Sequence, residues 1–288
     1  MLASLLSAIP MEEALIRLTA TALVIIVVTW SVELFGPMIG GVLAGLPITL
    51  GPGFYFLVAQ ASQPFVERAA SYSLWSLCAT QCFLLAYVLR GRHASPASTL
   101  TGAILAWGAA AVILRAMPST LWLGGLLFAL TTAACLWAGR KAVRPAARAV
   151  GRPGLGSLLL RGILAGALVA GVTTASHRLG AALSGLLLSF PIGYSVISVT
   201  IHQHMGRHTA TATLYSALLG TTSLAVFCAV LALAIPQHDP YTALGLALAS
   251  SAVVTSALAL WRRRGQRAAH PADNRAAPAG QSGRARKT

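Results

Sequence analysis

Long apolar runs, separated by short polar or basic segments, dominate the chain from residue 14 to residue 261. A helix needs about 20 consecutive apolar residues to cross the hydrocarbon core of a bilayer. The runs that approach this length are 14–34, 38–60, 69–89, 98–116, 121–138, 158–176, 179–201, 209–235 and 241–261. The pattern therefore predicts an all-α polytopic membrane protein with about nine transmembrane helices.

The second and seventh apolar runs contain residues that interrupt a helix. The second run carries Pro47 and Pro52 among several glycines, and the seventh carries Pro191. Proline has no amide proton, and its ring clashes with the carbonyl four residues back, so a helix kinks or opens there. In hydrocarbon, a freed carbonyl needs a partner from the protein or from a wet cavity. We therefore expect the second and seventh helices to be broken.

The two broken segments belong to a longer internal repeat. Placing Pro47 on Pro191 sets an offset of 144 residues, and the same offset matches identical residues along both halves. The matches are Leu15 with Leu159, Arg17 with Arg161, Val28 with Val172, Thr29 with Thr173, Gly36 with Gly180, Gly41 with Gly185, Leu43 with Leu187, Ile48 with Ile192, Leu74 with Leu218, and Phe83 with Phe227. Paired interrupted segments in two halves of a membrane chain point to a transporter's binding site.

The distribution of Lys and Arg predicts the orientation of the chain. Sixteen of them fall in the loop after the third run, the linker, the loop before the eighth run and the tail, against four on the other side. Cytoplasmic loops carry such an excess, so we expect the N-terminus outside and the C-terminus in the cytoplasm of a bacterial inner membrane. Five spans then separate equivalent positions of the two halves, and an odd number of crossings gives the halves opposite directions. The repeat is therefore inverted, with five spans in the first half and four in the second. If the second and seventh segments are re-entrant and do not cross the membrane, only four crossings separate equivalent positions, and the repeat is parallel.

The same reasoning divides the chain into four parts. Residues 1–138 form the first transmembrane repeat, 139–157 a basic cytoplasmic linker, and 158–262 the second repeat. Residues 263–288 are rich in Arg, Ala, Gly and Pro, a composition typical of a disordered tail.

Composition narrows the function classes. The chain is 56% hydrophobic and 9% charged, whereas soluble domains carry about 25% charged residues. Its net charge of +15 follows membrane topology rather than a nucleic-acid-binding stripe. The four cysteines lie in apolar runs without CxxC spacing, which favours small buried side chains. HExxH, P-loop and GxSxG motifs are absent from the sequence, so we expect neither an enzyme nor a cofactor.

The broken segments supply the candidate substrate site. Pro47 and Pro191 should lie near the middle of the bilayer and free the carbonyls of Leu43 and Leu187. The predicted substrate-binding residues are Leu43, Pro47, Ile48, Thr49, Gly51, Leu187, Ser189, Pro191, Gly193, Tyr194 and Ser195. The alternative is a pair of proline kinks packed on small residues, which is common in membrane helices.

A few ionisable residues near the membrane are candidates for coupling. Glu33, Glu67 and His177 could carry a proton or a cation, since ionisable groups in membrane segments are costly and usually functional. Arg17 and Arg161 could contact an anionic substrate, or extend to lipid headgroups.

Three imidazoles near a cytoplasmic helix end offer a metal-binding alternative. His204 and His208 are four residues apart, with His202 beside them, and imidazole binds divalent transition metals. No Asp, Glu or Cys accompanies them locally, and Gly206 separates His204 from His208. A divalent metal permease that uses these histidines is therefore one rival function. A non-catalytic scaffold of a membrane complex is the other.

In architecture the chain resembles small inverted-repeat secondary transporters. It is similar to drug/metabolite-type permeases in its repeats of five spans, although those usually have ten spans. It is similar to bile-acid-symporter-like carriers in its inverted repeats with broken helices, although those break a later helix. The resemblance implies alternating-access transport of a small organic solute, uncoupled or driven by a proton or sodium gradient. The expected partners are the solute and the lipid bilayer, not nucleic acid, and a homodimer is compatible with the sequence.

Overall fold

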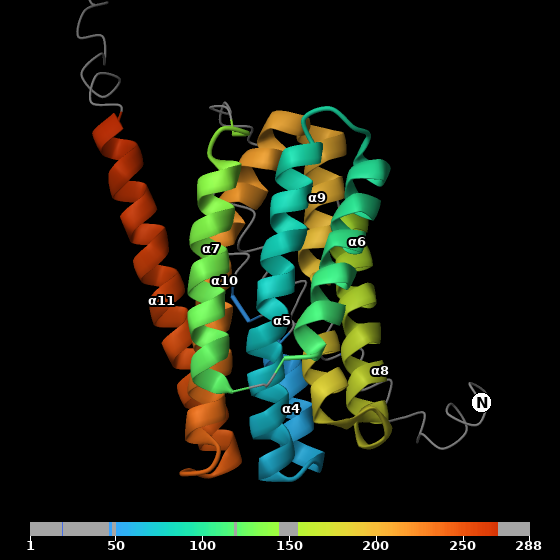
Figure 1. Ribbon diagram of the computed structural model, residues 1–288, viewed down its shortest axis with the longest axis vertical. Coiled ribbons are helices and arrows are strands. Elements are labelled where there is room, and N and C mark those ends of the chain that lie inside the picture. Colours follow the sequence, from blue (N-terminus) through green and yellow to red (C-terminus); the bar gives the residue numbers. More distant parts are fainter. Residues whose placement is uncertain (1–18, 20–45, 48–49, 118–119, 144–154, 270–288) are drawn as a thin grey trace, which may run out of the picture.

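The computed structural model describes Thr19 and residues 46–47, 50–117, 120–143 and 155–269 (Figure 1). At some positions of the last range, Arg161 and His177 among them, only the backbone is described. Every element in this part of the chain is a helix. The helices are α4 (Leu50–Gln60), α5 (Gln63–Arg90), α6 (Pro96–Arg115), α7 (Leu121–Gly139), α8 (Leu155–Leu188), α9 (Ile192–Met205), α10 (Arg207–Ala234) and α11 (Pro240–Ala269).

Six helical stretches of the described chain are long and apolar enough to cross a membrane. They are Gln63–Arg90, Pro96–Arg115, Leu121–Gly139, Arg178–Met205, Arg207–Ala234 and Pro240–Arg262. This confirms the prediction of an all-helical polytopic membrane protein. The first predicted run and the beginning of the second lie outside the described residues. The last helix continues to Ala269, past residue 261, where we expected the final span to end.

Sequence signals for helix starts explain several of the boundaries. Pro96 occupies the first turn of α6, where a missing amide proton costs nothing. The Ser95 hydroxyl before it accepts a bond from the Ser98 amide (3.4 Å), which is the usual N-cap contact. At the start of α11 the Asp239 carboxylate accepts a bond from the Tyr241 amide (3.1 Å). The loops before α6 and α11 therefore fix where each helix begins.

Helices α5 and α10 form the centre of the bundle, and both are buried along most of their length. They run antiparallel (Figure 1), because the loop after α5 lies beside the start of α10, where Arg207 Nη1 donates to the Arg92 carbonyl (3.1 Å). Phe83 and Phe227, which the repeat pairs, are both fully buried in the core. The packing between α5 and α10 therefore holds the bundle together.

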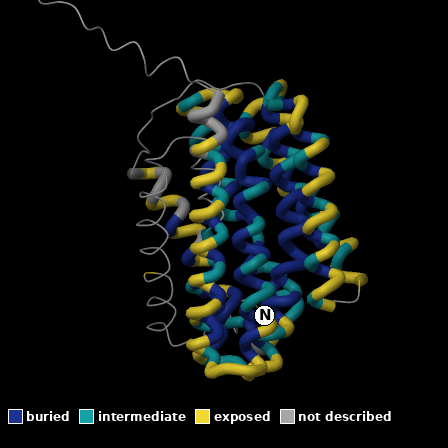
Figure 2. The backbone as a smooth tube through the Cα atoms, turned by 90° about the vertical axis from the view of Figure 1, so that its left-hand side faces the viewer, coloured by how far each residue is buried: buried dark blue, intermediate teal, exposed yellow. Residues whose placement is uncertain are grey.

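The outer helices α6, α7 and α11 have large apolar residues that are exposed. Figure 2 marks the exposed residues of the described chain in yellow. Large exposed apolar residues include Leu105, Val112, Ile113, Trp122, Trp137 and Val253. An extended apolar exterior of this kind is compatible with contact to lipid. It accounts for the apolar residues on the outer sides of these helices.

Helix α8 consists of two segments joined at Gly180. This residue has φ 73° and ψ 167°, a conformation that only glycine adopts without strain. The segment after it continues through Pro191 into α9, and together they form the apolar stretch Arg178–Met205 of 28 residues. The seventh predicted span is therefore one stretch made of two helical pieces, with Pro191 near its middle.

Candidate functional site

The chain breaks at Pro191 in the middle of this stretch. Helix α8 ends at Leu188, Pro191 has φ −78° and ψ 50°, and α9 begins at Ile192. We expected the proline to free the Leu187 carbonyl, but that carbonyl accepts a bond from the Phe190 amide (3.0 Å). The last turn has tightened to 3₁₀ geometry, which is common at helix ends. The Leu186 carbonyl thereby lacks its usual helical donor and needs partners from another helix, while the Gly185 carbonyl keeps the Ser189 amide (3.3 Å).

Those partners come from three hydroxyl groups on one face of α5, which we call the hydroxyl row: Ser73, Ser76 and Thr80. The bonds run from Ser73 Oγ to Gly185 O (2.8 Å), from Ser76 Oγ to Leu186 O (3.1 Å), and from Thr80 Oγ1 to Ser189 O (3.2 Å). Spacings of three and four residues put the donors on one side of the helix. The hydroxyl row therefore provides protein partners for the broken end of α8, as an interrupted helix in a membrane requires.

Two of the polar side chains predicted to bind substrate, Ser189 and Ser195, lie in this break and are bonded to backbone. Ser189 is buried, and its hydroxyl lies within hydrogen-bond distance of the Ser73 and Gly185 carbonyl oxygens (3.3 and 3.1 Å). The Ser195 hydroxyl donates to the Pro191 carbonyl (2.8 Å). The buried Tyr194 and the half-buried Leu187 and Gly193 lie in the same segment. In this conformation the break is therefore a packed and internally bonded region.

The matching position in the first half is partly described. Pro47 is buried just before α4, and its carbonyl accepts a bond from the Gly51 amide (2.7 Å). Glu67 lies in the first turns of α5 and is partly exposed, away from the break. Arg161 and His177 fall within α8, where only the backbone is described. The predictions outside the described residues are Arg17, Glu33, Leu43, Ile48 and Thr49.

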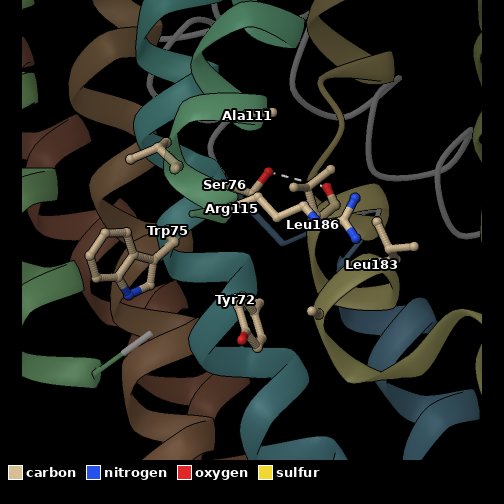
Figure 3. Close-up of a pocket in the computed structure, with 9 residues that line it drawn as sticks. Tyr72, Trp75, Ser76, Ala111, Arg115, Leu183 and Leu186 are labelled. Atoms are coloured by element: carbon tan, nitrogen blue, oxygen red, sulfur yellow. Dashed lines mark hydrogen bonds between the residues drawn. The ribbon is translucent and has the colours of Figure 1, made fainter. Parts of the chain in front are cut away.

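A small cavity opens beside the hydroxyl row, between α5, α6 and the second segment of α8 (Figure 3). Its lining residues are Tyr72, Trp75, Ser76, Ala111, Leu114, Arg115, Ala182, Leu183 and Leu186. A volume of about 20 Å³ holds about one water, whereas ligand pockets measure roughly 300–1,000 Å³. None of the predicted substrate-binding residues that the structure describes lines it. Ser76 links it to the break, because its hydroxyl donates to the Leu186 carbonyl (3.1 Å).

The three histidines do not form a cluster. The Tyr87 hydroxyl lies 3.1 Å from the Ser198 carbonyl and 3.2 Å from His202 Nδ1, which ties His202 to α5. His204 and His208 are exposed. Among the described residues no group of three or more His, Cys, Asp or Glu side chains converges as a metal site would require. The structure therefore offers no support for the metal-permease alternative.

Sequence reasoning missed the hydroxyl row. A usable signal was present, because serine and threonine recur at spacings of three and four in an otherwise apolar run. Such residues commonly bond to the carbonyl of their own preceding turn, so the pattern alone does not reveal a partner on another helix.

Comparison with known proteins adds no relative. The chain matches no protein family model, and it is not significantly similar to any curated protein or solved structure compared with it.

Removing a donor from the hydroxyl row should destabilise the protein. Thr80→Val takes the hydroxyl away from the buried Ser189 carbonyl, and an unpaired buried acceptor costs roughly 1–3 kcal/mol. We expect a lower thermal unfolding midpoint in detergent. Thr101→Val is the control, because the exposed Thr101 hydroxyl bonds only to Ala97 O in its own helix (3.0 Å). Equal shifts in the two variants would contradict this role of Thr80.

Proposed function

We propose that the chain is a secondary transporter that moves a small organic solute by alternating access, with the broken stretch Arg178–Met205 as its moving part. The observation that carries the proposal is the break at Pro191 in the middle of this stretch. Broken helices at the membrane midplane are typical of transporter binding sites. A helix interruption there is tolerated only where protein or a cavity satisfies the freed backbone, and the hydroxyl row does this.

The helix boundaries support an internal repeat. Helices α5 and α10 have 28 residues each, and their first residues, Gln63 and Arg207, are 144 positions apart. Helices α6 and α11 begin at Pro96 and Pro240, again 144 positions apart. This is the offset that aligns Pro47 with Pro191. Because α5 and α10 run antiparallel (Figure 1), we infer that the two repeats have inverted topology.

The same type of backbone hydrogen bond occurs at each of the two proline breaks. The Pro47 carbonyl accepts from the Gly51 amide (2.7 Å), and the Pro191 carbonyl accepts from the Ser195 amide (2.8 Å). Both prolines precede a short helix that leads into one of the two central helices. We infer that α4 and α9 are equivalent half-helices, and that the substrate binds where they approach the midplane.

The charge at the helix ends supports a cytoplasmic C-terminus. Helices α5, α7 and α11 end on the same side of the bundle (Figure 1). Arg90 is the last residue of α5, Arg140 directly follows α7, and Arg262 ends the apolar stretch of α11. Arg207, at the start of α10, joins them through its bond to the loop after α5. A basic end of this kind faces the cytoplasm. The N-terminus then lies outside if the chain crosses the membrane nine times.

A scaffold function remains the second candidate, because the break is packed and the cavity beside it is small. A transporter in an occluded conformation has the same properties. The two functions make different demands on the break. Alternating access requires it to meet water from each side of the membrane in turn, whereas a scaffold keeps it closed. Access of water to the break therefore separates the two.

Cysteine labelling tests the proposal without a known substrate. In a variant whose native cysteines are replaced by alanine, Ser189→Cys reports on the break. Leu84→Cys is the control, because Leu84 is fully buried in the core. A membrane-impermeant maleimide is added to right-side-out and to inside-out vesicles. We expect Ser189→Cys to react from both faces, and Leu84→Cys to react only after denaturation.

Two results would count against the transporter. Reaction of Ser189→Cys from neither face would favour the scaffold. Simultaneous, rapid reaction from both faces, together with leakage of small ions, would indicate an open pore rather than alternating access. The unfolding midpoint of both cysteine variants is measured first, so that labelling of unfolded protein is recognised.

A further inference from the structure

A second polar site lies in the core on another face of α5, at Gln81. Its side chain is fully buried, and the buried threonines Thr132 and Thr221 lie on the neighbouring helices. The amide nitrogen Nε2 lies 2.6 Å from Thr132 Oγ1 on α7. The same nitrogen lies 2.9 Å from Thr221 Oγ1 and 3.2 Å from the Leu218 carbonyl on α10. Three oxygen atoms from two other helices therefore converge on one point beside Gln81.

The hydrogen bonds of Gln81 are unevenly distributed. Its Nε2 carries two protons but has three acceptors within 3.2 Å. Its Oε1 is buried and has no hydrogen-bond partner in the described structure. The two ends of the amide cannot simply be exchanged, because the Leu218 carbonyl only accepts and so requires the nitrogen on its side. The Thr221 hydroxyl itself donates to the Leu218 carbonyl (2.8 Å), so the two Nε2 protons are enough for the cluster, and the atom left over is the buried Gln81 Oε1.

Packing of α5 against α10 does not require this polarity. The repeat pairs Gln81 with Ala225 and Thr221 with Leu77, both apolar and buried, while Leu74 and Leu218 are identical and buried. The same helix pair is thus held by apolar contacts at the equivalent positions. Apolar side chains of similar volume often serve stability as well as a buried polar network does. Gln81 and Thr221 therefore call for a role other than packing.

We propose that Gln81, Thr132, Thr221 and the Leu218 carbonyl form a binding site for one sodium ion. Rotation of the Gln81 amide would bring Oε1 beside the other three oxygens, and the ion would lie between the four oxygen atoms. Hard cations are bound by carbonyl, amide and hydroxyl oxygens. Sites of this kind near the midplane hold the coupling ion of several transporters.

The position of the site links ion binding to the broken stretch, an inference that rests on the proposed function. Gln81 follows Thr80 directly, and Thr80 donates to the Ser189 carbonyl at the break (3.2 Å). A rotation or shift of α5 that accommodates the ion therefore acts on a bond to the broken end of α8. The site occurs once, because its equivalent in the repeat is apolar, so we expect one sodium ion per chain.

Thermal unfolding in different salts tests the site. The purified full-length protein is unfolded in sodium, potassium and choline chloride at equal ionic strength. At a hundredfold excess over the dissociation constant, sodium should raise the midpoint by about 5 °C. Gln81→Leu and Thr221→Val should each lose this rise. Thr213→Val is the matched control for Thr221→Val. Thr213 is also buried on α10, but its hydroxyl bonds only to the Thr209 carbonyl of its own helix (2.8 Å).

The outcomes separate this site from the transporter proposal. Equal midpoints in all three salts, or a rise with potassium alone, would overturn the sodium site. A sodium effect that persists in Thr221→Val would also overturn it, even if Gln81→Leu fails to fold. If sodium has no effect while Ser189→Cys still reacts from both faces, the ion assignment is wrong and alternating access stands. A sodium effect without labelling would support the site and contradict transport.

Discussion

Gly185→Ala should leave little folded protein, the largest effect that we expect from any single substitution in this chain. A methyl group at Gly185 would overlap the Ala69 carbonyl oxygen and lie 3.0 and 3.1 Å from the carbonyl carbon and Cα of Ala69. The obstacle is the backbone of the central helix α5 at the fully buried Ala69, so it cannot move aside. Overpacking usually costs about 1–3 kcal/mol, and we expect at least about 3 kcal/mol here.

Gly171→Ala is the matched control for this prediction. Gly171 belongs to the same helix, α8, and a methyl group there meets no atom within 4 Å. Alanine has a higher helix propensity than glycine by up to about 1 kcal/mol, so the control should fold as well as the parent. Folded yield after size-exclusion chromatography and the unfolding midpoint in detergent measure both variants. A normal yield for Gly185→Ala would show that α5 and α8 are not in backbone contact.

Pro191→Ala should keep the fold but remove access to the break. Alanine restores an amide proton that can bond to the Leu187 carbonyl, which allows the helix to continue through residues 189–191. A continuous helix cannot bend at the midplane, so the maleimide reaction of Ser189→Cys should fall at least tenfold on one face of the membrane. We expect the unfolding midpoint to stay close to that of the parent, because the gained helical bond offsets the lost packing of the break.

Pro236→Ala is the control, because Pro236 is exposed in the turn after α10. It should change neither the labelling nor the midpoint. Loss of folding in Pro191→Ala would instead mean that the proline is needed for packing, as the alternative of simple proline kinks states. Unchanged labelling with an intact fold would contradict a moving part at Pro191.

The sequence was sufficient to predict the features that depend on the surrounding hydrocarbon and on the covalent geometry of single residues. Runs of apolar residues predict membrane helices because hydrocarbon cannot hydrogen-bond the backbone. Pro191 predicts a break because proline lacks a proton and its ring collides with the preceding turn. Gly180 and Gly206 both have positive φ, and each lies at a boundary that composition alone suggested only approximately. These properties depend on local sequence, so they can be predicted from it.

Features that depend on contact between distant helices were not predictable from the sequence. The hydroxyl row donates to carbonyls more than 100 positions away, and the tightened turn before Pro191 changes which carbonyls need those donors. Gln81 was not recognised either, since its role depends on Thr132 and Thr221 meeting it in space. A single sequence without aligned relatives contains no signal for such pairs.

The lengths of the helices determine how the protein fits the bilayer. Helices α5 and α10 have 28 residues each, or about 42 Å at 1.5 Å per residue, which matches a bilayer including its headgroups. Helices α6 and α7 have 20 and 19 residues, or about 30 Å, which matches the hydrocarbon alone. Where α6 and α7 face the lipid, the boundary is therefore free of hydrophobic mismatch, while the central pair extends into the headgroup region. A moderately thinner membrane should then tilt the outer helices and leave the central pair unstrained.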